Sequence, residues 1–333
     1  MNVDEASAII RTRPQLVAQG MTQASIGAAV RSGGLHKVGR GCFVEGDAWD
    51  AANHEARHLM TVVATDLRAH GVVFSHVSAC ILHGLPLVRH LPGRVHTSGR
   101  ALNGQVRRSE PEVARHQVAV LEPDITDVDG IRCTTLARSV ADTIRCVPEE
   151  TALTIADAAM RRIAWDETTR TYDVAAGDRF RSEVRAQLPV GGRGVKQARM
   201  ILDLADGRAD GPGESISRLY LVQLGYPVPT LQARVRGQKG AYLFLDMLLE
   251  DLGVIAEFDG MVKYSDPEML GGRSTAEAVL DEKAREDWIR GVTGMRVVRW
   301  GWEDIASVDT LRRRLRAFGL YPPGRPRPAS DHL

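Results

Sequence analysis

The stretch AYLFLDMLLEDLGVIAEFDGMVKYSD, residues 241–266, contains two apolar runs, each of the length of a β-strand, and each run carries a carboxylate. Asp246 lies inside the first run, and Glu257 follows the apolar part of the second. Side chains alternate between the two faces of a strand, so acids on neighbouring strands converge where their faces coincide. Two unit charges ~4 Å apart repel by about 4 kcal/mol at an effective dielectric near 20. We therefore expect protonation, a basic partner or a divalent cation at this place, and carboxylate oxygens suit Mg²⁺ or Mn²⁺.

The flanking segments predict a mixed α/β domain around these acids. A Gly/Pro-rich break at 207–213 precedes a helix that begins at Glu214 and carries apolar residues at helical spacing. The elements expected after it are strands at 231–236, 241–249 and 253–258, a helix at 276–290 and a strand at 295–300. The predicted order is α-β-β-β-α-β. Lys263 follows Glu257 closely enough in the chain to reach the same place and orient a water molecule.

This order of elements and acids resembles the PD-(D/E)XK nuclease core, a restriction-endonuclease-like fold. Within that superfamily, the segments FLDMLL, IAEFDGMVKY and EKAREDWIRGVTGMRVVRW are similar to the DUF559 and very-short-patch-repair-like branch. The resemblance covers residues 191–305. It implies metal-dependent hydrolysis of a DNA phosphodiester, with Asp246 and Glu257 holding Mg²⁺ or Mn²⁺ and Glu214 assisting.

Two positions separate this chain from the plain nuclease motif. Asp259 stands where E-x-K would place a lysine, and Lys263 fills the last position of a D-G-x-x-K arrangement. Both residues belong to the catalytic set that the resemblance implies. Two other interpretations stay open: acids that keep a sheet edge from pairing with another chain, or an inactive nuclease core kept for binding.

The first 46 residues predict a winged helix-turn-helix. Thr22 is a suitable N-cap for a helix that runs to about residue 31, and two short strands, 35–38 and 42–44, follow around a glycine-rich turn. We expect four basic or titratable side chains on one edge, suited to DNA phosphates: Arg31, His36, Lys37 and Arg40. The alternative is a solvated basic turn without a ligand.

Residues 1–163 as a whole resemble AbiEi-type antitoxin regulators. GMTQASIGAAVRSGGLHKVGRGCFV is similar to the winged helix of that family, and VFSHVSACILHGLP and GIRCTTLARSVADTI to the domain that follows it. The resemblance implies DNA binding and autoregulation of a type IV toxin–antitoxin operon. A cognate toxin would then be a partner through operon regulation only.

The segment NHEARHLM contains the metalloprotease pattern H-E-x-x-H, formed by His54, Glu55 and His58. On a helix the two histidines share a face and could bind zinc. Arg57, between them, adds like charge beside the ion, and no third ligand follows at a suitable spacing. We therefore expect a structural helix here. The remaining histidines show no ligand spacing, and surface or satisfied core positions are expected for them.

Composition favours a multidomain α/β (α+β) protein of the cytoplasm. The 333 residues carry a net charge of +1, four scattered cysteines, no apolar run of membrane-spanning length and an acidic N-terminus unlike an export signal. The expected regions are a winged helix at 1–46, a mixed domain at 47–163, a linker or helical connector at 164–190 (loop-like over 164–178), a nuclease-like domain at 191–320 and a Pro-rich tail at 321–333. The leading hypothesis is a DNA endonuclease dependent on Mg²⁺ or Mn²⁺; the alternative is a catalytically silent regulator. The oligomeric state is not predictable.

Overall fold

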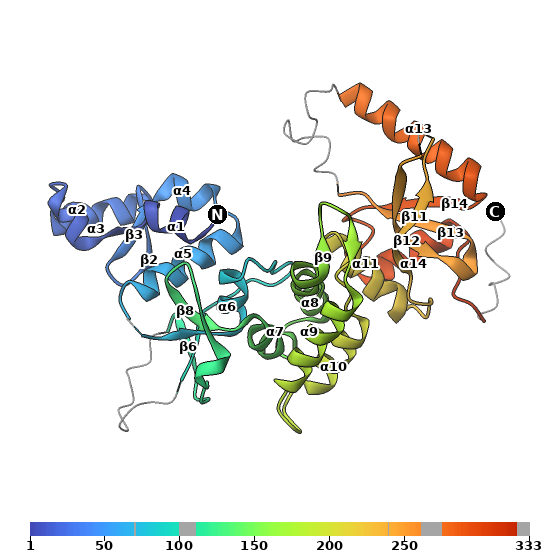
Figure 1. Ribbon diagram of the computed structural model, residues 1–333. Helices are drawn as coiled ribbons and strands as arrows, with labels where there is room; N and C mark the ends of the chain where they lie inside the picture. The colour runs from blue at the N-terminus through green and yellow to red at the C-terminus, as the bar shows by residue number, and fades with distance from the viewer. Residues whose placement is uncertain (70, 100–110, 239, 261–274, 325–333) are drawn as a thin grey trace. The chain divides into compact units, whose positions relative to one another are not determined.

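The computed structural model describes residues 1–69, 71–99, 111–238, 240–260 and 275–324 (Figure 1). The protein is a mixed α/β chain, as predicted, and it divides into two compact units. Unit 1 comprises Met1–Ala159 and Ala175–Asp203. Unit 2 comprises Met160–Val174 and Leu204–Leu333. Within the described ranges, no helix combines the length and the apolarity that crossing a bilayer requires.

Unit 1 opens with short helices on a small sheet. The elements are α1 (Val3–Ile9), β1 (Arg11–Thr12), α2 (Arg13–Ala18), α3 (Gln23–Ser32), β2 (Leu35–Gly39) and β3 (Cys42–Glu45), and the strands form an antiparallel sheet in the order β1-β3-β2.

The predicted helix and hairpin of this segment are confirmed. Helix α3 begins where the Thr22 hydroxyl accepts a hydrogen bond from the Ser25 amide, in a capping box, and it ends at Gly33, whose φ is +83°. One hydrophobic cluster of this segment takes a buried side chain from each of α2, α3, β2 and β3: Leu16, Ile26, Leu35 and Phe43.

The rest of unit 1 surrounds a five-stranded sheet with the order β6-β5-β4-β8-β7. Its strands are β4 (Val73–Phe74), β5 (Val95–Ser98), β6 (Val113–His116), β7 (Ile125–Val128) and β8 (Ile131–Thr134), with the 3₁₀ turn η2 (Glu122–Asp124) before β7. Its helices are α4 (Gly46–Ala51), α5 (His54–Asp66), α6 (His76–Leu82), α7 (Leu136–Ile144), α8 (Glu149–Ala164), α9 (Val174–Ala186) and α10 (Val195–Leu204), of which α8, α9 and α10 cross the boundary between the units. The strand and helix predicted from GIRCTTLARSVADTIRCV are confirmed as β8 and α7.

The loop predicted at 164–178 is wrong. This segment forms a hairpin of β9 (Trp165–Asp166) and β10 (Thr171–Tyr172), and α9 begins at Val174. The turn is held locally, because the Asp166 carboxylate accepts hydrogen bonds from the amides of Thr168 and Thr169, at 2.8 and 3.2 Å. Two-residue strands are too short to show a hydrophobic period, so polarity was misleading here.

Unit 2 is built around a four-stranded sheet with the order β11-β12-β13-β14. Its elements are α11 (Pro212–Gln223), β11 (Thr230–Arg236), β12 (Tyr242–Leu249), η3 (Glu250–Leu252), β13 (Val254–Phe258), α13 (Thr275–Thr293), β14 (Arg296–Trp300) and α14 (Val308–Ala317). The predicted α-β-β-β-α-β succession is confirmed. The first three strands pair antiparallel, and β13 pairs parallel with β14.

Helices cover both faces of this sheet (Figure 1). On one face, Ile289 of α13 packs against Leu245 of β12 and Ile255 of β13. On the other, the indole nitrogen of Trp300 in β14 donates a 2.8 Å hydrogen bond to the Ser217 hydroxyl of α11. The acids of β12 and β13 therefore belong to a sheet enclosed between helices.

Candidate functional site

The acids predicted in β12 and β13 line one cavity of unit 2, with a volume of about 380 Å³. We call it the acid–arginine pocket, because its walls carry five carboxylates and three guanidiniums. Its lining residues are Arg170, Asp210, Gln232, Tyr242, Leu243, Phe244, Asp246, Glu257, Phe258, Asp259, Glu282, Arg285 and Arg299.

The pocket lies where β12 and β13 stop pairing through their backbones. The ladder between them runs from Leu249↔Val254 to Met247↔Ala256. One step further, the amide of Phe258 donates to the carboxylate of Asp246 at 3.0 Å. A side chain thus takes the place of a backbone acceptor, and the half-buried Asp246 is fixed at the fork between the strands.

Glu257 is held by two arginines. Its Oε1 accepts from Nη1 of Arg285 at 2.9 Å, and its Oε2 accepts from Nη2 and Nε of Arg299 at 2.7 and 2.9 Å. Glu257 is buried, whereas each arginine is more than a quarter exposed. Glu282 also pairs with both arginines. Of the compensations expected for the acids, the structure supplies a basic partner to Glu257.

Glu214 lies in the first turn of α11 and is buried. One carboxylate oxygen accepts from the amide of Asp210 at 3.0 Å. Burial, and next the negative charge of Asp246, raise the pKa of Glu214 to about 8. Glu214 is therefore protonated at neutral pH, which relieves its repulsion with Asp246.

Asp259 and Lys263 complete the set of predicted site residues. Asp259 lines the acid–arginine pocket, and its backbone amide donates to the carbonyl of Trp300 at 2.9 Å. Lys263 lies outside the described residues. The structure therefore brings Asp246, Glu257 and Asp259 to one pocket.

Sequence reasoning missed the arginines of this pocket. Arg299 stands directly opposite Glu257 in the parallel register of β13 and β14, and Arg285 lies one helical turn after Glu282. Arg285 also donates to the carbonyl of Phe244 at 2.8 Å, which ties α13 to β12. The spacing of Glu282 and Arg285 was a readable signal of a charge pair on one helix face, but the pairing with Glu257 depends on strand order.

Three of the four residues predicted to contact phosphate are exposed in unit 1: Arg31, Lys37 and Arg40. His36 differs, because its ring stacks on Trp49 with centroids 3.9 Å apart and planes at 7°. Burial, and next the charge of Arg57, lower the pKa of His36. Neighbouring side chains of a strand point to opposite faces, so His36 and Lys37 lie on opposite faces of β2.

The H-E-x-x-H residues occupy the first turns of α5 and contact protein groups. The His54 ring contacts the carbonyl of Leu87 at 3.3 Å, and Glu55 accepts from the amide of Leu87 at 2.6 Å. The buried ring of His58 contacts the Ser78 hydroxyl at 2.9 Å. These contacts support the predicted structural role of the helix.

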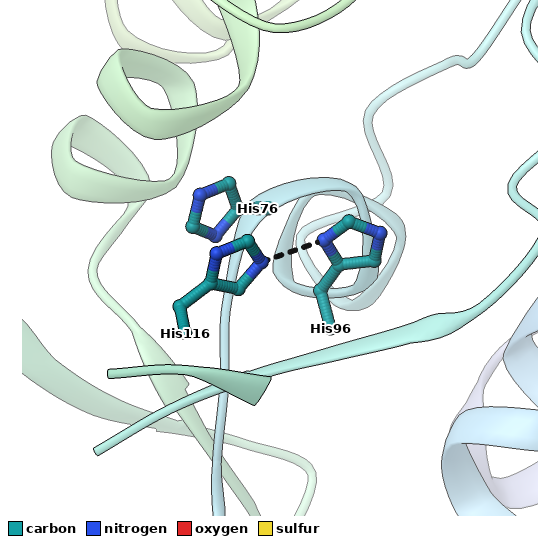
Figure 2. A group of neighbouring side chains, drawn as sticks. All are labelled: His76, His96 and His116. Atoms are coloured by element: carbon teal, nitrogen blue, oxygen red, sulfur yellow. Dashed lines mark hydrogen bonds between the residues drawn. The ribbon is translucent and has the colours of Figure 1, made fainter. Parts of the chain in front are cut away.

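Three other histidines come together although their spacing in the chain matched no ligand pattern. His76, His96 and His116 each offer a ring nitrogen within 4.8 Å of the others. Figure 2 shows them as neighbours in unit 1. The sequence predicted surface or satisfied core positions for these histidines, and it gave no sign that the three would meet.

No family model matches this chain. Over 92 residues the chain is 34% identical to two proteins of Mycobacterium tuberculosis, "uncharacterized protein Rv2248" of strain H37Rv and "uncharacterized protein MT2308" of strain CDC 1551 / Oshkosh. The match covers 28% of this chain and 34% of each relative, so the chain spans about a third of the length of these curated relatives. Neither name states an activity, so the function of this chain is argued from the geometry of each unit.

Proposed function

We propose that this chain is a cytoplasmic DNA-binding protein of the transcription-regulator class, with a winged helix-turn-helix in unit 1 and a restriction-endonuclease-like core in unit 2. The observation that carries the proposal is the exposed basic set Arg31, Lys37 and Arg40, presented by α3 and by the hairpin after it. In winged helices these two elements contact DNA, the helix in the groove and the hairpin on the backbone.

The regulator interpretation is favoured in unit 2 by the arginines on Glu257. Both oxygens of this carboxylate already accept charge-assisted hydrogen bonds from Arg285 and Arg299. A metal ion there would share this carboxylate with two guanidiniums, whose positive charge opposes a cation. This arrangement agrees with a nuclease-like core that no longer cleaves and is kept for its fold or for binding. The more specific version of the regulator proposal is autoregulation of a toxin–antitoxin operon.

The nuclease resemblance implies Mg²⁺ or Mn²⁺. The carboxylates that the structure describes near this pocket are suitable ligands for these ions, but their positions do not form a binding site. Among the described residues, Glu214, Asp246 and Glu257 do not form a group whose ligand atoms lie within 4.8 Å of one another. Burial and the charge of Asp246 raise the pKa of Glu214, so an ion that binds there must displace a proton. We therefore derive no metal-dependent step from this arrangement.

Hydrolysis of DNA phosphodiester bonds is the second candidate, and one observation favours it. Carboxylates outnumber guanidiniums by five to three on the walls of the acid–arginine pocket. A phosphate that enters would meet an excess of negative charge, which a divalent cation compensates. The enzyme hypothesis thus requires a divalent cation that enters the pocket together with the DNA phosphate.

The DNA-binding proposal is tested by charge reversal on the hairpin. In a mobility-shift titration over several salt concentrations, the double variant Lys37→Glu/Arg40→Glu should bind more weakly. Loss of two phosphate contacts should reduce the slope of log K against log salt by about 1.8. The matched control is Lys196→Glu/Arg199→Glu, another exposed Lys/Arg pair, on α10 of unit 1. Equal loss in both double variants would point to net charge alone and count against the winged helix.

The two candidate roles of unit 2 are separated by a plasmid-nicking assay with Mg²⁺ or Mn²⁺ and by thermal melting with and without the ion. If the regulator proposal holds, the parent protein should not cleave the plasmid. Its melting temperature should also show no Mg²⁺- or Mn²⁺-dependent shift that Asp246→Asn abolishes. Cleavage by the parent protein that disappears in Asp246→Asn would instead establish the enzyme.

A further inference from the structure

Three imidazoles of unit 1 meet without any acid among them (Figure 2). Nδ1 of His96 and Nε2 of His116 lie 2.9 Å apart, and the ring of His76 stacks on that of His116 with centroids 3.7 Å apart. Imidazole nitrogen is the ligand of Zn²⁺ and its transition-metal neighbours, not of Mg²⁺. We propose that His76, His96 and His116 bind one such ion, Zn²⁺ in the first place, separately from the acid–arginine pocket.

The fold positions the three rings from three different elements. His76 is the first residue of α6, His96 lies in β5, and His116 ends β6. Strands β5 and β6 are parallel with His96 opposite Ala114, so His116, two residues on, lies on the same face of the sheet as His96. His76 has a φ of +52°, the left-handed conformation that a residue with a side chain rarely adopts. Such strain is kept only where the surrounding structure requires that placement, and it is frequent at ligand sites.

The protonation state of the cluster suits a metal ion. Burial lowers the pKa of His76 to about 2 and that of His96 to about 4, and it also lowers the pKa of His116. The rings are therefore neutral at physiological pH, which is the state that ligates. The contact between His96 and His116 requires one ring to donate a proton to the other. When an ion binds, that proton moves to the other nitrogen of the same ring, and both facing nitrogens become ligands without a net loss of protons.

Hydroxyl groups contact the His76 ring and the backbone of His96. Nδ1 of His76 contacts the Ser75 hydroxyl at 3.0 Å, and the Ser98 hydroxyl donates to the same oxygen at 2.8 Å. If Nδ1 of His76 carries the proton, Nε2 is left for the metal, which is the usual way that a neighbouring acceptor selects a ligand nitrogen. The backbone amide of His96 is held by the Ser78 hydroxyl at 2.8 Å.

The spacing of the three ligand nitrogens must adjust when an ion binds. Tetrahedral Zn–N bonds of about 2.0–2.1 Å place ligand nitrogens roughly 3.3 Å apart. Here the three atoms lie within 4.8 Å of one another, and the His96–His116 pair is 2.9 Å apart. The rings of His76 and His116 are nearly parallel, at 12°, so at least one must turn about its Cβ–Cγ bond to face the ion. This torsion has a broad energy minimum in histidine, so the turn costs little.

A fourth coordination position would open into a cavity of about 260 Å³, lined in part by His76, His90, Arg94, His96 and Cys146. Cys146 and His90 line this cavity without belonging to the three-histidine group. Three neutral ligands leave the charge of a divalent ion uncompensated, and Arg94 adds to it. A water-derived hydroxide or a small anion is therefore the fourth ligand that the electrostatics favour.

The test measures Zn²⁺ binding to the full chain by equilibrium dialysis with elemental analysis, and affinity by competition with a chromophoric chelator. We expect one ion per chain, a higher melting temperature with Zn²⁺, and a visible Co²⁺ spectrum typical of tetrahedral coordination. His96→Gln and His116→Gln should each weaken binding at least 10-fold and remove the stabilisation. Both side chains are only half-buried, so the metal-free variants should melt close to the metal-free parent protein.

Two control variants separate this site from other ligands. His90→Gln removes an imidazole from the same cavity, and Asp246→Asn alters the acid–arginine pocket; both should keep one Zn²⁺ per chain at unchanged affinity. Absence of stoichiometric binding by the parent protein would overturn the proposal. The same holds if His96→Gln and His116→Gln bind as tightly as the parent, or if Asp246→Asn alone abolishes binding.

Discussion

At the scale of single residues, Glu257 is the central ion-pair partner of the acid–arginine pocket, because it joins β13 to the arginines of α13 and β14. Glu257→Gln keeps the shape of the side chain but leaves Arg285 and Arg299 with only Glu282 as a shared carboxylate. We expect a loss of about 2–3 kcal/mol in unfolding free energy, below the ~3–5 kcal/mol typical of a broken buried pair, because both guanidiniums are partly exposed. Urea denaturation measures it.

Glu282→Gln is the matched control for this prediction. Glu282 contacts the same two arginines, but its side chain is 31% exposed against 8% for Glu257. Solvent replaces much of what its carboxylate contributes, so the loss should be under about 1 kcal/mol. Equal losses in the two variants would show that the arginines are not organised around Glu257.

The protonated Glu214 gives the stability of the protein a defined dependence on pH. Its pKa rises from an ordinary 4.5 to about 8 in the folded protein, so between these values the folded state holds a proton that the unfolded chain has lost. Stability contributed by this group is therefore fully present below pH 4.5 and decreases as the pH rises towards 8.

Glu214→Gln cannot ionise and should remove this decrease. The variant should gain stability relative to the parent as the pH rises from 4.5 to 8, measured by urea denaturation at several pH values. Glu303→Gln, at an exposed glutamate of the same unit, should follow the parent curve. Asp246→Asn should lower the folded-state pKa of Glu214, because Asp246 raises it. The decrease should then begin at the same pH as in the parent but end at a lower pH and be smaller. Parallel curves for the parent and Glu214→Gln would mean that Glu214 is ionised in the folded state.

At the scale of elements, the start of α11 depends on a glycine that allows close approach. A Cβ added to Gly213 would lie 2.0 Å from the Phe258 ring at the end of β13. Gly213→Ala should therefore destabilise unit 2 by about 1–3 kcal/mol, as overpacking does. Gly291→Ala, in α13 with open space around it, should be neutral or stabilising by up to about 1 kcal/mol.

A double variant identifies the cause of this effect. If the clash with the ring is responsible, shortening the ring in Phe258→Leu should recover part of the loss, so the two changes would not be additive in urea denaturation. Full additivity would place the effect of Gly213→Ala in the backbone of α11 and not in its contact with β13.

Elements with strong local signals were predictable from the sequence. Thr22 and Gly33 mark the ends of α3, and the apolar runs around Asp246 and Glu257 mark two adjacent strands. The hairpin at 165–172 was not predictable, because each of its strands has two residues. A capping residue or a long periodic run acts locally, and it can be recognised without knowledge of the fold.

The sites were only partly predictable for the same reason. The convergence of Asp246 and Glu257 follows from alternation along neighbouring strands. The arginine partners of Glu257 depend on β14 lying parallel beside β13, and the three histidines meet across α6, β5 and β6. Such long-range contacts have no fixed spacing in the chain.

At the scale of the whole molecule, the chain enters unit 2 twice. Residues Met160–Val174 belong to unit 2, and the chain then returns to unit 1 until Asp203. Within unit 2 this first passage supplies Arg170, which lies over the Phe244 ring at 4.1 Å, and Tyr172, over which Arg208 lies at 4.4 Å. Arg161 also pairs with Asp210 at 2.7 Å. A boundary at residue 191, as predicted for the nuclease-like domain, separates these groups from their partners.

A fragment of residues 204–333 should therefore be less stable than one of residues 160–333. The shorter fragment lacks two cation–π contacts, each worth about 0.5–1 kcal/mol at exposed positions, together with the partner of Asp210. We expect a lower urea midpoint for fragment 204–333 and a midpoint for fragment 160–333 close to the unit 2 transition of the full chain. Arg170→Ala/Tyr172→Ala in the longer fragment should reproduce part of the difference. Identical midpoints for the two fragments would show that Leu204–Leu333 folds without the first passage, and that the ring contacts of Arg170 and Tyr172 add no stability.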